Sequence, residues 1–298
     1  MAKRASRVTG PAAVAILVML VWGATPIMTR VALDDLEPLV VATLRTVVAG
    51  LLAVPLLVQA RVRLPSTRAT RRLVGVAGLA GFVVFPVVYT VGQERTSGLH
   101  GVMILAALPI FTGLYASLVT RSRPRRAWLV GSVVALAGEA VLIGGRAAGG
   151  GSGGDASLAG DLIVLGAALI VSAGYVAGAM LPPRGVPSAA ATYWGVALGA
   201  LVLAPLGAAL LATDGWPDAS ATAWGAVLFL AVVTSILGYI GWYWALDRGG
   251  IQRIATFQFL QPLSGFALAA LVLGDSVTAP IAVGSALIVA GIALAQRA

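Results

Sequence analysis

Residues 222–245, TAWGAVLFLAVVTSILGYIGWYWA, form a run of 24 residues without a charged side chain. A transmembrane helix needs about 20 consecutive, mostly apolar residues, so this run is long enough to cross a membrane. Apolar and polar residues do not alternate along it, as they would in a strand of an outer-membrane barrel. The stretch therefore predicts a membrane-spanning helix, and the rest of the chain repeats its pattern.

The composition of the whole chain agrees with this prediction. Of its 298 residues, 59% are apolar and 10% are charged, and the mean hydropathy is +0.96. Soluble domains are about 45–50% apolar and about 25% charged, so a disordered chain, a DNA-binding module and an ordinary soluble enzyme are disfavoured. Hydropathy predicts an all-α polytopic membrane protein with ten transmembrane helices, at residues 11–30, 38–59, 72–92, 97–119, 127–144, 160–181, 189–212, 222–245, 252–273 and 279–296.

The basic residues predict the orientation of these helices. Sixteen of the twenty Lys and Arg residues lie in one set of connecting segments, three lie in the other set, and Arg45 lies within a span. Segments rich in Lys and Arg stay in the cytoplasm, so both termini are expected there, with the chain in the cell inner (plasma) membrane. The net charge of +9 is then a topology signal, and we expect membrane lipid and no nucleic acid as a partner. The first apolar run has span length and lacks a small-residue cleavage pattern, which argues against a signal peptide.

An internal repeat appears when the sequence is shifted against itself by 153 residues. We expect a first five-helix repeat at 1–146, a Gly-rich linker at 147–157 and a second repeat at 158–298. Because five is odd, the second repeat enters the membrane from the opposite side, and inverted repeats are common in secondary transporters that work by alternating access. The superimposed pairs are Glu94-Arg95 on Asp247-Arg248, Pro109 on Pro262, Gly131-Ser132 on Gly284-Ser285 and Ala137-Gly138 on Ala290-Gly291.

Several short motifs together carry a family resemblance. They are Trp22-Gly23-Ala24-Thr25-Pro26, Pro38 followed by Arg45, Gly241-Trp242-Tyr243-Trp244-Ala245-Leu246, and Gln261-Pro262 running to Leu273-Gly274-Asp275. With them the chain resembles the EamA type of the drug/metabolite transporter (DMT) superfamily over nearly its whole length, and within it the bacterial exporters of amino acids, including aromatic ones. The family often has Glu where this chain has Asp275.

The resemblance implies that the helices at 127–144 and 279–296 pack together away from the transport path, while the others surround a central cavity. The residues agree, because Gly131 and Gly138, like Gly284 and Gly291, are seven positions apart and share a helix face. Small residues on one face let membrane helices approach closely.

Two prolines mark the candidate hinge. Pro109 and Pro262 lie near the middle of predicted spans, where proline removes a backbone hydrogen bond and kinks the helix. Interrupted helices near mid-depth point to a binding site or hinge in transporters, and a purely structural kink is the alternative. Gln258 and Gln261 flank the second break and should face inward, since polar groups are costly to expose to lipid.

Three ionisable residues are candidates for a functional role. Arg45 could bind a substrate carboxylate, act as a structural cation or extend toward the membrane surface. Glu139 could pair with Arg45 or carry protons, although its place in a helix expected at the periphery favours a structural role. Histidine side chains ordinarily titrate near neutrality, so His100 could serve a proton-linked switch, with an interfacial histidine as the alternative.

Aromatic residues supply the remaining candidates. Tyr239, Trp242 and Tyr243 share one helix face, and Tyr89 holds a comparable place in the first repeat; they could stack on a substrate or form an interfacial belt. Three aromatic residues lie deeper in their predicted spans and are therefore expected to line the cavity: Trp22, Tyr175 and Trp194. Trp128, Trp216 and Trp224 lie at span ends and are expected in the belt.

These observations predict a secondary transporter that exports small neutral or zwitterionic metabolites, foremost amino acids. A phosphorylated substrate would need several cations at mid-depth, and only Arg45 is there. A multidrug, purine or sugar exporter of the same fold is the alternative, and an intramembrane enzyme is a remote one because neither a catalytic motif nor a metal-ligand cluster is evident. We expect no cofactor. The direction, export, rests on the resemblance alone.

Overall fold

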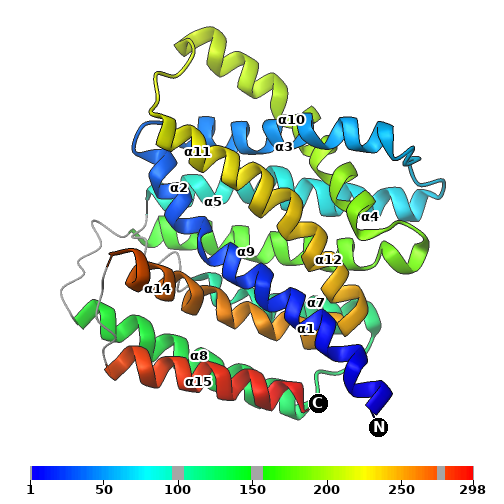
Figure 1. Cartoon of the computed structure of the whole chain (residues 1–298), viewed down its shortest axis with the longest axis vertical. Coiled ribbons are helices and arrows are strands. Elements are labelled where there is room, and N and C mark those ends of the chain that lie inside the picture. Colours follow the sequence, from blue (N-terminus) through cyan, green and yellow to red (C-terminus); the bar gives the residue numbers. More distant parts are fainter. Residues whose placement is uncertain (1, 96–103, 149–156, 274–278, 298) are drawn as a thin grey trace.

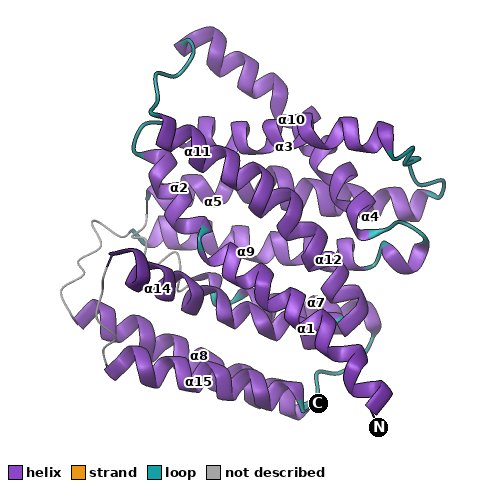
Figure 2. Cartoon of the chain, viewed as in Figure 1, coloured by secondary structure: helices purple, strands orange, loops and turns teal. Residues whose placement is uncertain are grey.

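The computed structural model describes residues 2–95, 104–148, 157–273 and 279–297. Within these residues every regular element is a helix and there is no strand (Figure 2). Six stretches of the described chain are long and apolar enough to cross a membrane: Gly10–Leu33, Pro38–Gln59, Arg68–Glu94, Leu158–Arg184, Ser188–Asp214 and Ala221–Gly249. The all-helical prediction is confirmed. The number of ten spans and their orientation remain predictions.

Several prolines lie in the first turn of a helix, where a longer helix is interrupted or a new one begins. The first span consists of α1 (Ala2–Gly23) and α2 (Thr25–Leu33), which meet at Ala24, and Pro26 lies in the first turn of α2. Proline is tolerated there because the first N–H groups of a helix have no partner within the helix. The hydropathy pattern predicted one continuous helix at this place.

The predicted kinks at Pro109 and Pro262 are instead helix starts. The helix α7 (Leu108–Thr120) begins one residue before Pro109. In the second half, α13 (Ile251–Ala255) leads into a 3-10 turn, η4 (Thr256–Phe259), and Pro262 lies in the first turn of α14 (Leu260–Leu273). Each proline therefore costs no hydrogen bond within its own helix.

Two π-helical segments interrupt other spans. Between α4 (Arg68–Leu79) and α5 (Phe85–Glu94) lies η1 (Ala80–Val84), and between α11 (Ala221–Phe229) and α12 (Gly238–Gly249) lies η3 (Leu230–Leu237). Shifting the first by 153 residues places it inside the second. Single π-turns within α-helices are rare and occur often at functional sites.

The helices α8 (Arg126–Ala148) and α15 (Ala279–Gln296) form a pair at the lower edge of the bundle in Figure 1. A Cβ atom at Gly291 would lie 2.5 Å from the amide nitrogen of Ala135. This backbone approach agrees with the spacing of the glycines. The main body contains α3 (Pro38–Gln59) packed on α10 (Ser188–Asp214), α1 on α12, and α5 on α9 (Leu158–Ala179).

Trp128 lies at the start of α8 and is 2% exposed, so the expectation that it belongs to an interfacial belt is wrong. Its indole nitrogen donates a hydrogen bond to the carbonyl of Gln252 over 3.1 Å. The ring thus joins the α8/α15 pair to α13 of the main body.

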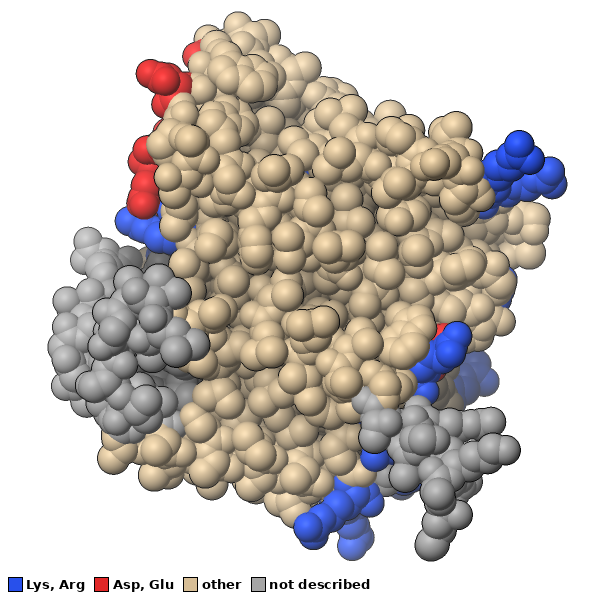
Figure 3. All heavy atoms as spheres, viewed as in Figure 1, with Lys and Arg blue, Asp and Glu red and all other residues tan. Residues whose placement is uncertain are grey.

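Charged side chains gather at the ends of the bundle. In Figure 3 most acidic residues in view lie along the upper left edge, most basic ones lie at the right and lower right, and uncharged atoms cover the space between. Both ends of the chain lie at the basic side (Figure 1). An apolar waist between charged ends is the surface of a multi-pass membrane protein.

Candidate functional site

Five aromatic residues from three helices meet in the main body, and we call them the aromatic box: Trp22 of α1, Tyr175 of α9, and Tyr239, Trp242 and Tyr243 of α12. The ring centroids of Trp22 lie 5.4 Å from Tyr175 and 5.3 Å from Tyr239, and Trp242 lies 5.7 Å from Trp22. None of the five is more than 4% exposed. All five were candidates from the sequence, and their burial excludes an interfacial belt for the three on α12.

Both π-helical segments border the aromatic box. The indole nitrogen of Trp22 donates to the carbonyl of Thr234 in η3 over 3.0 Å. The hydroxyl of Tyr239 donates to the carbonyl of Gly81 in η1 over 3.2 Å, and Phe82 of η1 packs against the Tyr239 ring at 4.4 Å. The box therefore bridges the repeat-related irregular segments of the two halves.

Arg45 is held at the same place from α3. Its side chain is 3% exposed, and its Nη2 donates to the hydroxyls of Thr234 and Ser235, each over 3.2 Å. Its Nε and Nη1 have no hydrogen-bond partner. Among the described residues, no carboxylate forms a salt bridge with it.

The suggested pairing of Arg45 with Glu139 is wrong. Glu139 lies on α8, in the peripheral pair, and is 1% exposed with neither carboxyl oxygen hydrogen-bonded. The second role considered for it, proton carriage, stays a prediction. His100 lies outside the described residues.

The other predicted site residues that the structure describes form no ring contact with the box. Tyr89 of α5 is fully buried, stacks on Phe85 at 5.0 Å, and has an unpaired hydroxyl. Trp194 of α10 is half-buried with an unpaired indole nitrogen. Gln258 in η4 is 1% exposed with both amide atoms unpaired, and Gln261 is half-buried with an unpaired carbonyl oxygen. Several inward-facing polar groups thus lack a partner, a feature of sites that receive a ligand.

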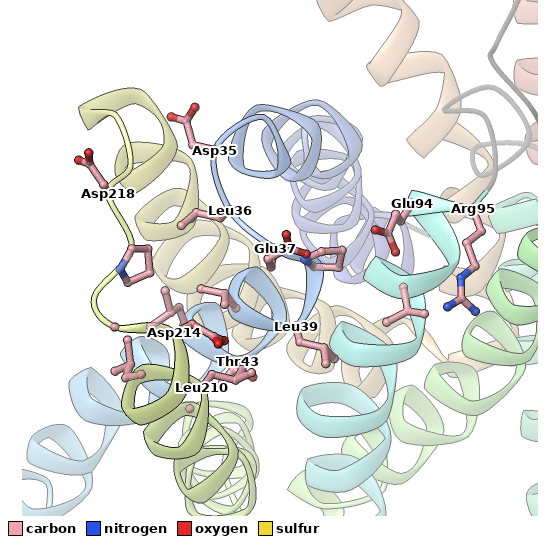
Figure 4. A pocket seen from close by; sticks show the side chains of 18 residues that line it. Asp35, Leu36, Glu37, Leu39, Thr43, Glu94, Arg95, Leu210, Asp214 and Asp218 are labelled. Atoms are coloured by element: carbon pink, nitrogen blue, oxygen red, sulfur yellow. The ribbon is translucent and has the colours of Figure 1, made fainter.

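A pocket of about 700 Å³ opens at the acidic end of the bundle (Figure 4). The sequence analysis missed it, because it used the acidic residues there only as weak topology signals. Its lining on α3 ends with Thr43 and Leu44, directly before Arg45. Carboxylates at its lining are those of Asp35, Glu37, Glu94, Asp214 and Asp218, and apolar residues such as Leu39 and Leu210 lie between them.

One of these carboxylates also forms a hydrogen bond that stabilises one side of the pocket. Asp35 accepts a hydrogen bond from the backbone N–H of Ser220 over 2.9 Å, joining the loop after α2 to the residue that caps α11. Hydrogen bonds from Ser220 hold the pKa of Asp35 below its ordinary value. Within the described residues, no group of three or more His, Cys, Asp or Glu side chains could hold a metal ion.

The hydroxyls of Thr234 and Ser235 were also missed. Both stand in an otherwise apolar run, and polar side chains within a span usually face the protein interior, so this signal was present in the sequence. The sequence did not indicate which residue these hydroxyls contact, because Arg45 lies 189 residues away from Thr234.

Known proteins resemble this chain along most of its length. The family model described as "EamA-like transporter family" matches residues 10–144 and 158–296. An uncharacterized transporter of Bacillus subtilis (strain 168) is 31% identical over 94% of each chain. A protein of Salmonella typhimurium named "Probable amino-acid metabolite efflux pump" is 28% identical over 93% of this chain and 92% of its own length.

Two further similarities complete this comparison. A Streptantibioticus cattleyicolor protein named "Probable terminal-alkyne amino-acid exporter" is 26% identical over 95% of this chain and 92% of its own length. A solved crystal structure with 22% sequence identity superimposes with a TM-score of 0.75, covering 96% of this chain and 98% of the other. This superposition shows that the two proteins share a fold.

Proposed function

Because the chain belongs to the EamA-like transporter family, we propose that it is a secondary transporter that exports small neutral or zwitterionic metabolites, foremost amino acids including aromatic ones, by alternating access across the inner membrane. The observation that carries this proposal is the buried aromatic box beside Arg45, with the lining of the acidic-end pocket ending on α3 directly before Arg45. Rings can pack on an apolar side chain while the guanidinium takes a polar end.

In many secondary transporters, alternating access is carried out by two related halves that rearrange around one site. Supporting features are the match of one family model to both halves, the repeat-related π-helical segments, and the helix starts near Pro109 and Pro262. We propose residues 1–146 and 158–298 as inverted five-helix repeats joined by 147–157, with ten spans and cytoplasmic termini. The breaks before Pro109 and Pro262 would be the hinges, because interrupted helices can bend without losing further hydrogen bonds.

The chemistry of the site favours amino acids over the alternatives. Arg45 is the only buried Arg or Lys among the side chains whose burial the structure describes, which suits one carboxylate better than a phosphate. The names of two relatives refer to amino acids, which supports the same substrate class. Gln258, Gln261, Trp194 and Tyr89 would complete the lining of the open site, and Glu139 and His100 are the proposed proton-linked residues.

Counterflow in proteoliposomes tests this function. Vesicles with purified protein are loaded with unlabelled phenylalanine, threonine or methionine, and entry of the labelled compound is followed. We expect transient accumulation of the labelled compound. Trp242→Leu should lower this accumulation about tenfold, because it removes one aromatic contact worth about 1.4 kcal/mol. The matched control is Trp216→Leu, because Trp216 is 71% exposed. An inserted, folded protein that accumulates no amino acid but does accumulate a drug, purine or sugar would overturn the substrate class.

A further inference from the structure

We infer that Arg45 binds a free carboxylate on the transported molecule, and that this contact makes the carboxylate a requirement for recognition. The inference rests on the proposed function and makes its substrate class narrower. It begins with an imbalance in the structure: a guanidinium that is 3% exposed has no carboxylate beside it among the described residues. A buried cation is costly without a counter-charge, so its presence at this depth points to an anion that binds there for part of the cycle.

The hydroxyls beneath Arg45 hold it without neutralising it. Thr234 donates its hydroxyl proton to the carbonyl of Leu230 over 2.6 Å, and Ser235 donates to the same carbonyl over 2.8 Å. Each hydroxyl has only one proton, so toward Arg45 both can only accept. The π-helical turn therefore forms a fixed two-point acceptor for Nη2.

This fixed contact leaves the rest of the guanidinium free to bind. An arginine side chain has five N–H bonds, of which one is on Nε and two are on Nη1. Neither of these nitrogens has a partner in the structure. A carboxylate placed against them would form charge-assisted hydrogen bonds, which are shorter and stronger than neutral ones. The orientation of Arg45 is thus set before a ligand arrives.

The aromatic box shows what should be attached to that carboxylate. Thr234 contacts both parts of the site, since its hydroxyl accepts from Arg45 and its carbonyl accepts from Trp22. A molecule with its carboxylate at Arg45 would therefore have the Trp22 and Tyr239 rings next to its remaining atoms. Ring faces attract both apolar groups and an ammonium group, so an amino acid with an apolar side chain fits both parts.

The pocket on the acidic side extends toward this position and stops short of it. The pocket lining on α3 includes Thr43, whose buried hydroxyl is unpaired, and ends at Leu44. In the described conformation the rings of the box pack on one another, so the site is closed at this depth. The pocket and Arg45 would join in the alternating-access rearrangement, whose proposed hinges are the breaks before Pro109 and Pro262.

Binding to the purified protein tests the inference separately from transport. The thermal stability of the detergent-solubilised full chain is measured with phenylalanine, phenylalaninamide and 3-phenylpropionate. We expect phenylalanine and 3-phenylpropionate, which both carry a carboxylate, to stabilise the protein. The half-effective concentration of phenylalaninamide should be about ten- to hundredfold higher than that of phenylalanine, because the amide loses a charged hydrogen bond. Equal stabilisation by phenylalanine and phenylalaninamide would overturn the inference. So would the absence of stabilisation by both phenylalanine and 3-phenylpropionate.

Variants separate a binding role from a structural one. In Arg45→Gln the ratio between amide and acid should fall toward one, while Arg45→Lys should keep part of the preference. The control is Arg30→Gln, because Arg30 is exposed and pairs with Asp34 at 3.6 Å. If Arg45→Gln does not fold, the acid-to-amide comparison in the unchanged protein still decides.

Counterflow then distinguishes the two proposals. Carboxylate-selective binding without counterflow supports the role of Arg45 and contradicts the transport of these compounds. Counterflow of phenylalanine that phenylalaninamide inhibits as well as phenylalanine supports transport and contradicts the role of Arg45.

Discussion

Replacing Gly291 by alanine should force the α8/α15 pair apart. A Cβ atom at this position would lie 2.5 Å from the amide nitrogen of Ala135 and 2.6 Å from the carbonyl oxygen of Gly131, whereas ordinary contacts begin at 3.4 Å. The backbones must therefore separate by about 0.9 Å. Both atoms belong to the backbone of the facing helix, so no side chain can rotate away to relieve the contact.

The size of the effect follows from two opposing contributions. Overpacking of this kind costs about 1–3 kcal/mol. Alanine is also the better helix former, by about 1 kcal/mol. Gly166→Ala on α9 is the matched control, because a Cβ atom there would meet nothing within 4 Å. The difference in the free energy of unfolding between these two variants, about 1–3 kcal/mol, isolates the packing cost.

Unfolding in mixed detergent micelles, followed by tryptophan fluorescence, measures this difference. The double variant Gly131→Ala/Gly291→Ala should cost less than the sum of the single ones, since a Cβ at Gly131 would meet the Gly291 carbonyl oxygen at 2.5 Å and one separation relieves both contacts. The packing argument would be refuted if Gly291→Ala were as stable as Gly166→Ala. It would also be refuted if the stability losses of Gly131→Ala and Gly291→Ala were strictly additive in the double variant. Counterflow should persist, because this pair lies away from the aromatic box.

Three further predictions test other contacts. Trp22→Phe removes the donor to the Thr234 carbonyl and should cost about 1–3 kcal/mol of stability, measured by the same unfolding assay, together with a loss of counterflow. Trp128→Phe removes a similar hydrogen bond at α13 and should lower stability by a comparable amount while counterflow stays; a loss of counterflow at full stability would contradict this. Asp35→Asn should abolish a small pH-dependent stabilisation: because hydrogen bonds from Ser220 lower the pKa of Asp35, the contribution is complete above its ordinary value of 3.8 and is lost as the pH falls through the lowered value. The unfolding midpoints of the protein and this variant, compared from about pH 6 downward, should converge in acid, and a constant difference would show that another interaction is responsible.

The sequence predicted the components of the site better than their arrangement. Tyr239, Trp242 and Tyr243 were grouped correctly because helical spacing alone places them on one face. Their meeting with Trp22 and Tyr175 was not predictable, since those residues belong to other helices and the choice of facing partners depends on packing. The sequence likewise marked Arg45 as costly to bury but did not indicate its partners.

The irregular segments were beyond sequence reasoning for a different reason. The π-helical turns η1 and η3 have no distinctive residue pattern, and hydropathy treats them as ordinary helix. The pocket at the acidic end also lacks a linear signal, because residues of α3, α5 and α10 and the loops beside them line it together.

By itself, the sequence determined that the chain is helical, that its apolar runs are long enough for a membrane, and that glycine faces allow close contact of α8 and α15. Each of these properties depends on residues that are near one another in the chain, because hydropathy, helical spacing and the size of a side chain act locally. Only the tertiary structure decided that the Arg45 guanidinium rests on two hydroxyls of η3, with a ring of α1 bonded to the same turn. That contact joins residues 189 positions apart, and their distance depends on how every helix between them packs.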